Sequence, residues 1–347
     1  MKLGLLAGLF GPEAVINLEM IQRAESLGFD SVFTAEAYGN DAVTTATWIA
    51  AKTTKIKVGT AIMQMPGRTP AMAAMTAQTL DQLSGGRFIL GLGPSGPQVV
   101  EGWHGVPYGK PLTRTREYIS IVRKVLARKE PLTHQGEHYT IPNTGPGTTG
   151  LGKPLKSILH GRPDIKIYTA SISPNGLRCA GEVADGVFPL WTDPEKIPDV
   201  LLPHLEAGFA KAGGGKALAD FDICPAATVI ISDDLEKARM PVKMELALYI
   251  GGMGARDKNF YNDYAKRLGY EEEAAKIQDL FLDKKRAEAV AAVPDALVDE
   301  MNLIGPAERI RERLAVWREA GKKRHVDTLL IGANQPEALE LLAKELL

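Results

Sequence analysis

Serine and proline follow the apolar run Ile165–Ala170 in a pattern that could bind an anion. Ser173 is placed to cap a helix that starts at Pro174, with Asn175 and Gly176 in its first turn. The free amides of such a turn, together with the helix dipole, form a site for phosphate. The segment therefore predicts either a phosphate site or an ordinary capped helix, and these residues alone favour neither.

A second candidate is the glycine-rich segment after the apolar run Arg87–Leu90. Glycine lets a backbone bend sharply and lets a ligand approach it closely, so Gly93 and Ser95 are candidate contacts. The string Gly91–Gly96 has the spacing of a dinucleotide-binding loop, but Pro97 and the residue after it do not open a helix cleanly. A tight turn without a ligand is the alternative.

Four side chains could exchange a proton with a substrate. Glu36 follows the apolar run Ser31–Ala35, where a strand of a parallel barrel would meet its loop, and a carboxylate there is typical of catalysis or ligand binding. Tyr38, Glu101 and His104 could line the mouth of the same pocket. A lone histidine is more often a surface or hydrogen-bonded residue than a proton donor, so the alternative for His104 is that it has no chemical role.

The end of a third apolar run could support a flat ring. Lys55–Ile62 is followed by flexible apolar residues, and Ala61, Ile62 and Met63 could form a wall beneath an aromatic ligand. The alternative is that these residues belong to the hydrophobic core. Asp41, in contrast, is better placed to cap the next helix than to bind anything.

Short apolar runs alternating with helical patterns must position these residues. Strands separated by helices favour parallel pairing, and eight such units close a (β/α)8 TIM barrel of the α/β class. The eight predicted strands are Lys2–Ala7, Ser31–Ala35, Lys55–Ile62, Arg87–Leu90, Ile165–Ala170, Gly186–Leu190, Cys224–Ile231 and Thr328–Ile331. Because a barrel has its active site at the carboxyl ends of its strands, the residues named above are the candidates for catalysis and ligand binding.

We interpret the chain as one domain, residues 1–347, with two insertions. The first, about 92–164, follows strand four and contains a predicted helix, Thr113–Arg128, and a glycine-rich stretch, Ile141–Pro154. The second, about 233–325, follows strand seven and has a helical pattern. We expect both to lie over the carboxyl face, with Ile141–Pro154 as a flap, because long loops are often lids. A disordered connector is the alternative.

Composition narrows the possible partners. The 347 residues are 45% hydrophobic with a formal net charge of −1, which gives no basic footprint for nucleic acid. Two cysteines, Cys179 and Cys224, make neither a disulfide framework nor a metal pair, so we expect a cytoplasmic protein without a metal site. No run approaches the ~20 apolar residues of a membrane-spanning helix. A small-molecule substrate is the expected partner.

Several strings of this sequence resemble one family, the luciferase-like flavin and deazaflavin oxidoreductases. The similar strings are Gly28–Val32, Lys57–Thr60, Gly67–Pro70, Leu83–Phe88 with Gly91–Gly93, Ala184–Gly186 and Leu303–Pro306. The similarity is strongest to the branch that uses coenzyme F420, which includes methylenetetrahydromethanopterin reductase and F420-dependent glucose-6-phosphate dehydrogenase. It implies a luciferase-like barrel, a homodimer, and hydride transfer between the deazaflavin and a small organic substrate.

The resemblance also implies positions for the cofactor. It implies a non-prolyl cis peptide bond at Ala61-Ile62, against the middle ring, and a contact between Glu36 and the ring edge. The residues that it implies near the cofactor phosphate are Ser171, Ser173, Asn175, Gly176, Gly186 and Val187.

One position departs from the family. Some relatives, including the sugar-phosphate enzyme, have a histidine after the acid, whereas this chain has Ala37, which cannot move a proton. Any acid would then be Glu36, Tyr38, Glu101 or His104, or the reaction would need none, because hydride transfer depends chiefly on proximity and orientation. The alternatives are an FMN-dependent monooxygenase on the same scaffold and a non-catalytic F420- or flavin-binding protein.

Overall fold

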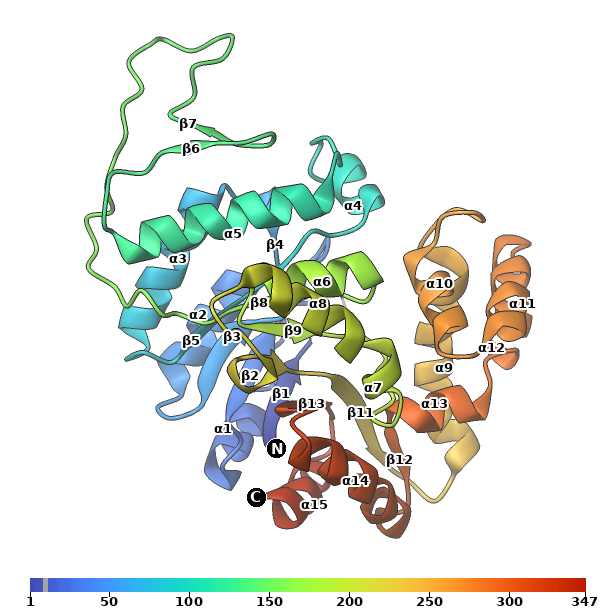
Figure 1. Ribbon diagram of the computed structural model, residues 1–347. Coiled ribbons are helices and arrows are strands. Elements are labelled where there is room, and N and C mark those ends of the chain that lie inside the picture. Colours follow the sequence, from blue (N-terminus) through green and yellow to red (C-terminus); the bar gives the residue numbers. More distant parts are fainter. Residues whose placement is uncertain (9–11) are drawn as a thin grey trace.

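A computed structural model describes residues 1–8 and 12–347 (Figure 1). Of the strand and loop predicted over residues 1–11, residues 9–11 therefore lie outside the described part. The barrel strands are β1 (Lys2–Ala7), β2 (Ser31–Thr34), β3 (Lys57–Thr60), β5 (Phe88–Gly93), β8 (Ile167–Ala170), β9 (Gly186–Phe188), β10 (Asp222–Ile223), β11 (Ala226–Ile231) and β13 (Thr328–Gly332). Short β4 (Met63–Gln64) pairs with the end of β5.

The strands close into a ring. All pairs among them are parallel, and their order is β10-β9-β8-β5-β3-β2-β1-β13-β11. Only Cys224 and Pro225 separate β10 from β11, so the two form one bent strand. The amide of Cys224 donates to the carbonyl of Val187 at 2.9 Å, and the amide of Leu330 donates to Pro225 at 2.8 Å. This strand thus joins both ends of the sheet, which confirms the predicted barrel.

Helices surround the barrel, and local signals explain their limits. They are α1 (Leu18–Leu27), α2 (Ala42–Lys52), α3 (Pro70–Leu83), α5 (Pro111–Ala127), α6 (Pro174–Val183), α8 (Leu202–Ala212), α14 (Ala307–Lys322) and α15 (Pro336–Leu346). Shorter turns are η1 (Met65–Gly67), α4 (Pro97–Gly102), α7 (Ile197–Val200) and η2 (Leu218–Asp220). Asp41 caps α2 by accepting a hydrogen bond from the amide of Thr44 at 2.6 Å, as predicted. Apolar residues at helical spacing predict a helix over Pro12–Leu27 that Gly28 stops. Helix α1 does end at Gly28, with a φ of 92°, but it begins at Leu18.

Side chains fill the interior of the barrel. Phe33, Tyr168 and Phe188 meet there edge to face, with ring centroids 5.2 Å apart for Phe33–Phe188 and 5.5 Å for Tyr168–Phe188. Ala61 and Ile62 pack on this cluster from the carboxyl end and remain partly exposed. The barrel therefore has a solid floor, and a ligand can lie only at its rim.

The first insertion is partly a standard barrel helix. Helix α5 packs between α3 and α6, and beyond it lies a hairpin of β6 (His134–Gln135) and β7 (Thr140–Ile141). The carboxylate of Glu117 in α5 holds the hairpin by accepting from the amides of residues 137–139 at 2.8–3.0 Å. Most of the stretch predicted as a flap, 141–154, extends beyond α5 and away from the strands (Figure 1). In this structure it does not cover the carboxyl face.

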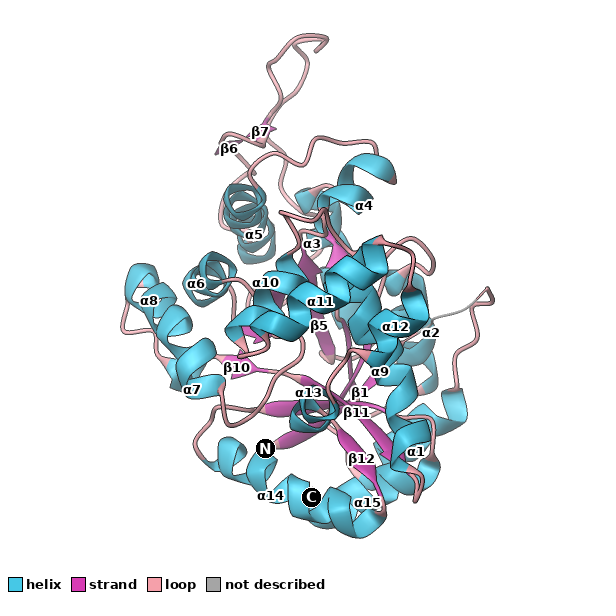
Figure 2. Cartoon of the chain, turned by 90° about the vertical axis from the view of Figure 1, so that its right-hand side faces the viewer, coloured by secondary structure: helices cyan, strands magenta, loops and turns pink. Residues whose placement is uncertain are grey.

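The second insertion forms a helical group with a small core of its own. It contains α9 (Leu235–Gly252), α10 (Phe260–Arg267), α11 (Glu271–Leu282), α12 (Arg286–Ala291) and α13 (Asp295–Met301). These helices stand together on one side of the barrel (Figures 1 and 2). Their core includes Trp191, which follows β9, and the side chain of Arg267 donates to the carbonyl of Ile172, which follows β8, at 3.0 Å. The group thus reaches the carboxyl ends of two strands.

The sequence prediction missed one strand within this insertion. β12 (Leu303–Gly305) pairs in parallel with β11, and Val229 lies opposite Leu303. Helix α14 follows it and belongs to the barrel, so the helical group ends before β12 rather than near residue 325. No helix among the described residues combines the length and the apolar character needed to cross a membrane.

Candidate functional site

A bulge at the end of β3 projects into the open end of the barrel. The peptide bond between Ala61 and Ile62 is cis, as the resemblance implies. Two glycines of β5 make room for the bulge, because a Cβ at Gly91 would lie 1.7 Å from the carbonyl oxygen of Thr60 and one at Gly93 would lie 2.7 Å from the side chain of Ile62. Packing against the bulge therefore explains Gly91 and Gly93, two of the glycines that give this segment its dinucleotide-like spacing.

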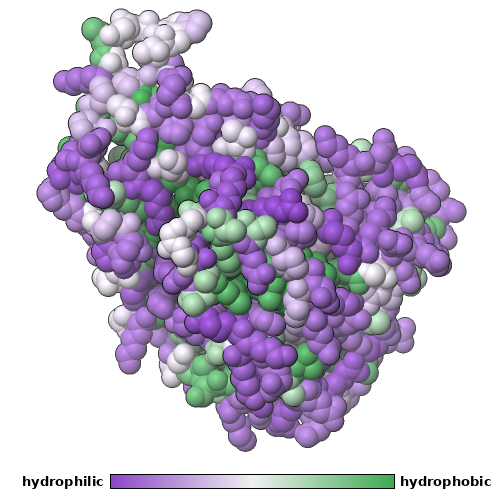
Figure 3. Space-filling model, viewed as in Figure 1, coloured by the Kyte–Doolittle hydropathy of each residue, from purple (hydrophilic) through white to green (hydrophobic). Residues whose placement is uncertain are grey.

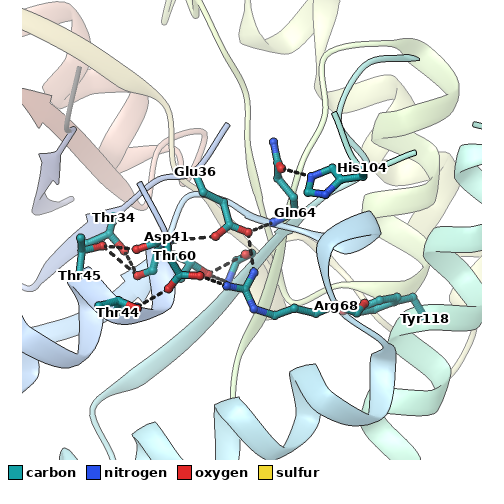
Figure 4. Close-up of polar contacts among 12 residues, drawn as sticks. Thr34, Glu36, Asp41, Thr44, Thr45, Thr60, Gln64, Arg68, His104 and Tyr118 are labelled. Carbon is teal, nitrogen blue, oxygen red and sulfur yellow. Dashed lines mark hydrogen bonds and ion pairs between the residues drawn. The ribbon is translucent and has the colours of Figure 1, made fainter. Parts of the chain in front are cut away.

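Glu36 is held beneath this bulge by three donors (Figure 4). One carboxylate oxygen accepts from the amide of Ala42 at 3.0 Å, and the other accepts from the amide of Gln64 at 2.7 Å and from the guanidinium of Arg68 at 2.7 Å. Its side chain is only 8% exposed. Arg68 also pairs with Asp41, and its carbonyl accepts from the hydroxyl of Tyr118 at 3.1 Å. Glu36 thus fastens β2, α2 and β4 to one another.

His104 reaches the same network through Gln64. Its Nε2 lies 2.7 Å from the side-chain oxygen of Gln64, so Nε2 donates and Nδ1 is left to accept a proton or a hydrogen bond. Gln64 is buried, with 4% of its surface exposed, and its backbone is the one that Glu36 binds. Sequence reasoning missed Gln64 and Arg68, whose only signal is their position just after a barrel strand.

The other two candidate proton donors lie at the surface. Tyr38 is 59% exposed on the loop after β2. Glu101 is exposed on α4 and accepts from the amide of Tyr108 at 3.2 Å. The structure therefore links Glu36 with His104 through Gln64, and it leaves Tyr38 and Glu101 outside this network.

The start of α6 forms a cradle for an anion. The hydroxyl of Ser173 accepts from the amide of Gly176 at 3.1 Å, which confirms the predicted cap, and Pro174 occupies the first turn. A Cβ at Gly176 would lie 2.9 Å from the Ser173 hydroxyl and 3.3 Å from that of Ser171. Pro174 has no amide proton, so the amide of Asn175 is the one in this turn that remains for a ligand.

Behind the cradle lies an unsatisfied hydroxyl. Thr169 is 2% exposed, and within the described part of the chain its hydroxyl has no hydrogen-bond partner. Thr169, Ser171 and Gly176 line one small hollow together with Cys179. Hydroxyls, a free amide and a helix N-terminus are the donors that a phosphate group needs, so these residues fit the phosphate of a flavin-type cofactor.

Three basic side chains that the sequence analysis did not select surround the cradle. Arg178 donates to the side chain of Asn175 at 3.3 Å, and Arg267 of α10 donates to the carbonyl of Ile172. Burial and the charges of Arg178 and Arg267 lower the pKa of His204 in α8. The start of α6 therefore lies in a positive field, which favours an anion. Arg267 comes from the second insertion, and no sequence signal relates it to α6.

Four predicted cofactor contacts are buried in this structure. Gly186 and Val187 are buried at the start of β9, where a Cβ on Gly186 would meet the ring of Tyr168 at 2.7 Å. Met63 has 0% of its surface exposed and belongs to the hydrophobic core, and buried Gly93 packs on the bulge.

Ser95 lies on the loop that follows β5. It is partly exposed and has a φ of 60°. Contrary to the sequence analysis, Pro97 does begin a helix, α4. Ser95 therefore keeps the accessibility that a ligand contact requires.

Aromatic rings of the second insertion form a wall beside the rim. Tyr249 of α9 and Tyr261 of α10 pack edge to face with centroids 4.8 Å apart, and Trp191 after β9 lies 5.7 Å from Tyr249 and 5.6 Å from Tyr261. Trp191 has a φ of 49°, which is rare for a bulky residue. We call these three residues the aromatic wall.

A separate hollow of about 500 Å³ lies between α13, β12 and α14. Several of its charged groups already have partners, because Asp299 pairs with Arg309 at 2.7 Å and Arg313 pairs with Glu195, outside the hollow, at 3.1 Å. Among residues 1–8 and 12–347, no group of acidic, histidine or cysteine side chains could hold a metal ion. The rim of the barrel therefore remains the best candidate site.

Comparisons with known proteins show the family of the chain. The family model for luciferase-like monooxygenases matches residues 12–324. The chain is 45% identical over 345 residues to Rv3520c of Mycobacterium tuberculosis, a proposed coenzyme F420-dependent oxidoreductase, covering 99% of this chain and 98% of that protein. It is 29% identical over 327 residues to the 5,10-methylenetetrahydromethanopterin reductase of Methanolobus tindarius, covering 93% of each chain.

Solved structures share the architecture. The coenzyme F420-dependent tetrahydromethanopterin reductase of Methanopyrus kandleri superposes with a TM-score of 0.78 at 23% identity, over 99% of this chain and 97% of that one. An F420-dependent secondary alcohol dehydrogenase, solved with an F420-acetone adduct, gives a TM-score of 0.75 at 19% identity, over 99% and 98% of the two chains. At these identities the likeness establishes the fold.

Proposed function

Because the chain belongs to the luciferase-like monooxygenase family, we propose that it is a coenzyme F420-dependent oxidoreductase acting on a small organic substrate. One observation of the structure carries the proposal: the Ala61-Ile62 bulge and the cradle at Ser173 and Gly176 lie at the same end of the barrel. A bound deazaflavin supplies a two-electron hydride carrier. Relatives named as F420-dependent enzymes make this cofactor the first choice.

The residues divide the work of binding between them. Ser171, Ser173 and the amide of Asn175 would hold the cofactor phosphate, and Arg178 and Arg267 add positive charge. The partly exposed side chain of Ile62 would support the ring. Glu36 holds the backbone here, because its amide donates to the carbonyl of Ile62 and its carboxylate accepts from the amide of Gln64. Glu36 is therefore a positioning residue in this proposal.

His104 is the best placed of the candidate proton carriers. The hydrogen bond from its Nε2 to Gln64 orients the ring, and Nδ1 is free to take up or release a proton. If the substrate is an activated C=C or C=N bond, positioning alone can suffice for hydride transfer. A variant His104→Gln separates the two cases, since it would abolish turnover of alcohols but not of activated double bonds.

A fluorescence titration tests the proposal directly. Purified protein is titrated with F420 and, separately, with FMN, and the emission of each cofactor is followed. Micromolar or tighter binding of F420, with much weaker binding of FMN, is the expected result. Tight binding of FMN alone would instead favour an FMN-dependent monooxygenase. Reduced F420 is then mixed with a panel of enones, imines and ketones, and absence of any oxidation would leave only a cofactor-binding protein.

A homodimer is part of the same proposal. The exposed faces of α2 and α3 carry Trp48, Met72 and Met75, which are 54%, 50% and 51% exposed, and Lys52 is the only charged side chain exposed on them. The face seen in Figure 1 is mostly hydrophilic by comparison (Figure 3). An exposed apolar surface on two adjacent helices suits contact with a second copy. The two cysteines are free thiols, which supports a reducing compartment such as the cytoplasm.

A further inference from the structure

Aromatic side chains from five separate segments meet above the strand ends. The aromatic wall joins Trp191, Tyr249 and Tyr261, as described above. Tyr108, from the loop after α4, acts electrostatically on Tyr261, so the two phenols are close. Tyr38, from the loop after β2, acts in the same way on Tyr249. The wall therefore lies close to loops from the other side of the rim.

A carboxylate without a partner stands beside the wall. Glu245 precedes Tyr249 by one helical turn, which puts both side chains on one face of α9. Within residues 1–8 and 12–347, Glu245 makes no hydrogen bond and no ion pair. Its side chain is exposed to solvent, and partial burial raises the pKa of its carboxyl group. Burial, Tyr261, Glu245 and Tyr38 together raise the pKa of Tyr249 to about 12.

Two of the three cations of α9 are paired with α13. Lys243 pairs with Asp295 at 2.5 Å, and Arg239 pairs with Asp299 at 2.6 Å, both toward α13. No lysine, arginine or histidine contributes to the pKa of Glu245. The groups that act on Tyr249 are therefore aromatic rings and one negative charge, which is the opposite of the positive field at the start of α6.

We propose that Glu245 and the aromatic wall form a subsite for a positively charged group of the substrate, a substituted ammonium or iminium attached to an apolar body. Aromatic faces attract such cations, and a carboxylate one helical turn from Tyr249 supplies the counter-charge. The same groups disfavour anionic substrates such as sugar phosphates, because a second negative charge would meet Glu245 without a cation to balance it. This subsite rests on the proposed function, in which a substrate shares the rim with the cofactor.

Calorimetric titration with three benzylic probes tests the charge preference. Benzyltrimethylammonium carries a positive charge, benzyl alcohol is neutral, and benzylphosphonate is negative. We expect the cation to bind about tenfold more tightly than the alcohol, and the phosphonate to bind least. In Glu245→Gln the advantage of the cation over the alcohol should fall to about twofold or less, with the affinity for the alcohol unchanged. Equal binding of the three probes would overturn the inference.

A matched control sits on the same helix. Glu236 is exposed in the first turn of α9, away from the aromatic wall, so Glu236→Gln removes the same charge without touching the subsite. We expect this variant to bind all probes normally, and an equal loss in both variants would overturn the role of Glu245. Tyr249→Leu should weaken the cation more than the alcohol, since it removes a ring face.

The two proposals fail in different ways. Each sample is also titrated with F420. Normal F420 binding without a cation preference would overturn the subsite and leave the proposed function intact. A cation preference that depends on Glu245, in a protein that binds no F420, would overturn the proposed function alone.

Discussion

We expect Glu36 to act by holding the bulge in place, and the variant Glu36→Gln tests this role. The carboxylate accepts from the amides of Ala42 and Gln64 and from the guanidinium of Arg68, at 3.0, 2.7 and 2.7 Å. A glutamine keeps one oxygen, so an NH2 group must face one of these donors. Losing one hydrogen bond to a charged group costs about 1.5–3 kcal/mol. Weakening the nearly buried pair with Arg68 adds to this, and the free energy of unfolding should fall by about 3 kcal/mol.

Glu25 provides the control for this variant. Its carboxylate also accepts from three backbone amides, those of Thr54, Lys55 and Ile56, at 2.6–3.0 Å, but at the amino end of β3. Glu25→Gln should therefore lower stability, by less because the group is more exposed, and should leave F420 affinity unchanged. Glu36→Gln should lower both stability and F420 affinity.

Urea unfolding and fluorescence titration of the two variants give the required measurements. The reasoning is refuted if Glu36→Gln is as stable as the parent and binds F420 equally well but loses turnover. That result would make Glu36 a proton donor and not a positioning residue. Recovery of affinity in Glu36→Asp would also count against the geometry, because the shorter side chain cannot span all three donors.

Three further expectations concern the cradle, its field and the dimer. Ser173→Ala removes a helix cap and a hydroxyl that would bind the cofactor, whereas Thr69→Ala removes only the cap of α3. Each variant should lose about 1 kcal/mol of unfolding free energy. Only Ser173→Ala should bind F420 more weakly in a titration. The pKa of His204 is lowered in the free protein, and a bound phosphate would raise it, so cofactor binding takes up a proton. F420 affinity should therefore rise as the pH falls below 7. His204→Asn should remove that pH dependence. Met75→Glu should convert a dimer to a monomer in sedimentation, without affecting cofactor binding in the monomer.

Strand positions could be predicted because barrel strands are buried on both faces. Such strands appear as continuous apolar runs, and all eight had been located from the sequence. β12 was missed because only Asn302 separates it from the end of α13, so no turn signal marks the start of a strand. The break in strand seven at Pro225 has a local cause, since proline has no amide proton to donate to the sheet.

The site was predictable only where its chemistry is local. Ser173 caps the helix that follows it, and caps depend on neighbouring residues alone. The ion pair of Glu36 is with Arg68, which comes from another segment, so the sequence indicated the acid but not the group that holds it. Arg267 and Tyr249 belong to an insertion whose packing against the rim no local pattern reveals.

The order of strands around the barrel separates the two proposed binding functions. Consecutive strands β3, β5 and β8 carry the bulge, the glycines that accommodate it and the anion cradle. The aromatic wall and Glu245 follow β9 and β11, on the next part of the ring. Groups that share no partner contribute independently to binding. Substitutions at Ser173 should therefore change cofactor affinity alone, and substitutions at Glu245 should change substrate selectivity alone, so a loss of both in either variant would mean that one ligand occupies both parts of the rim.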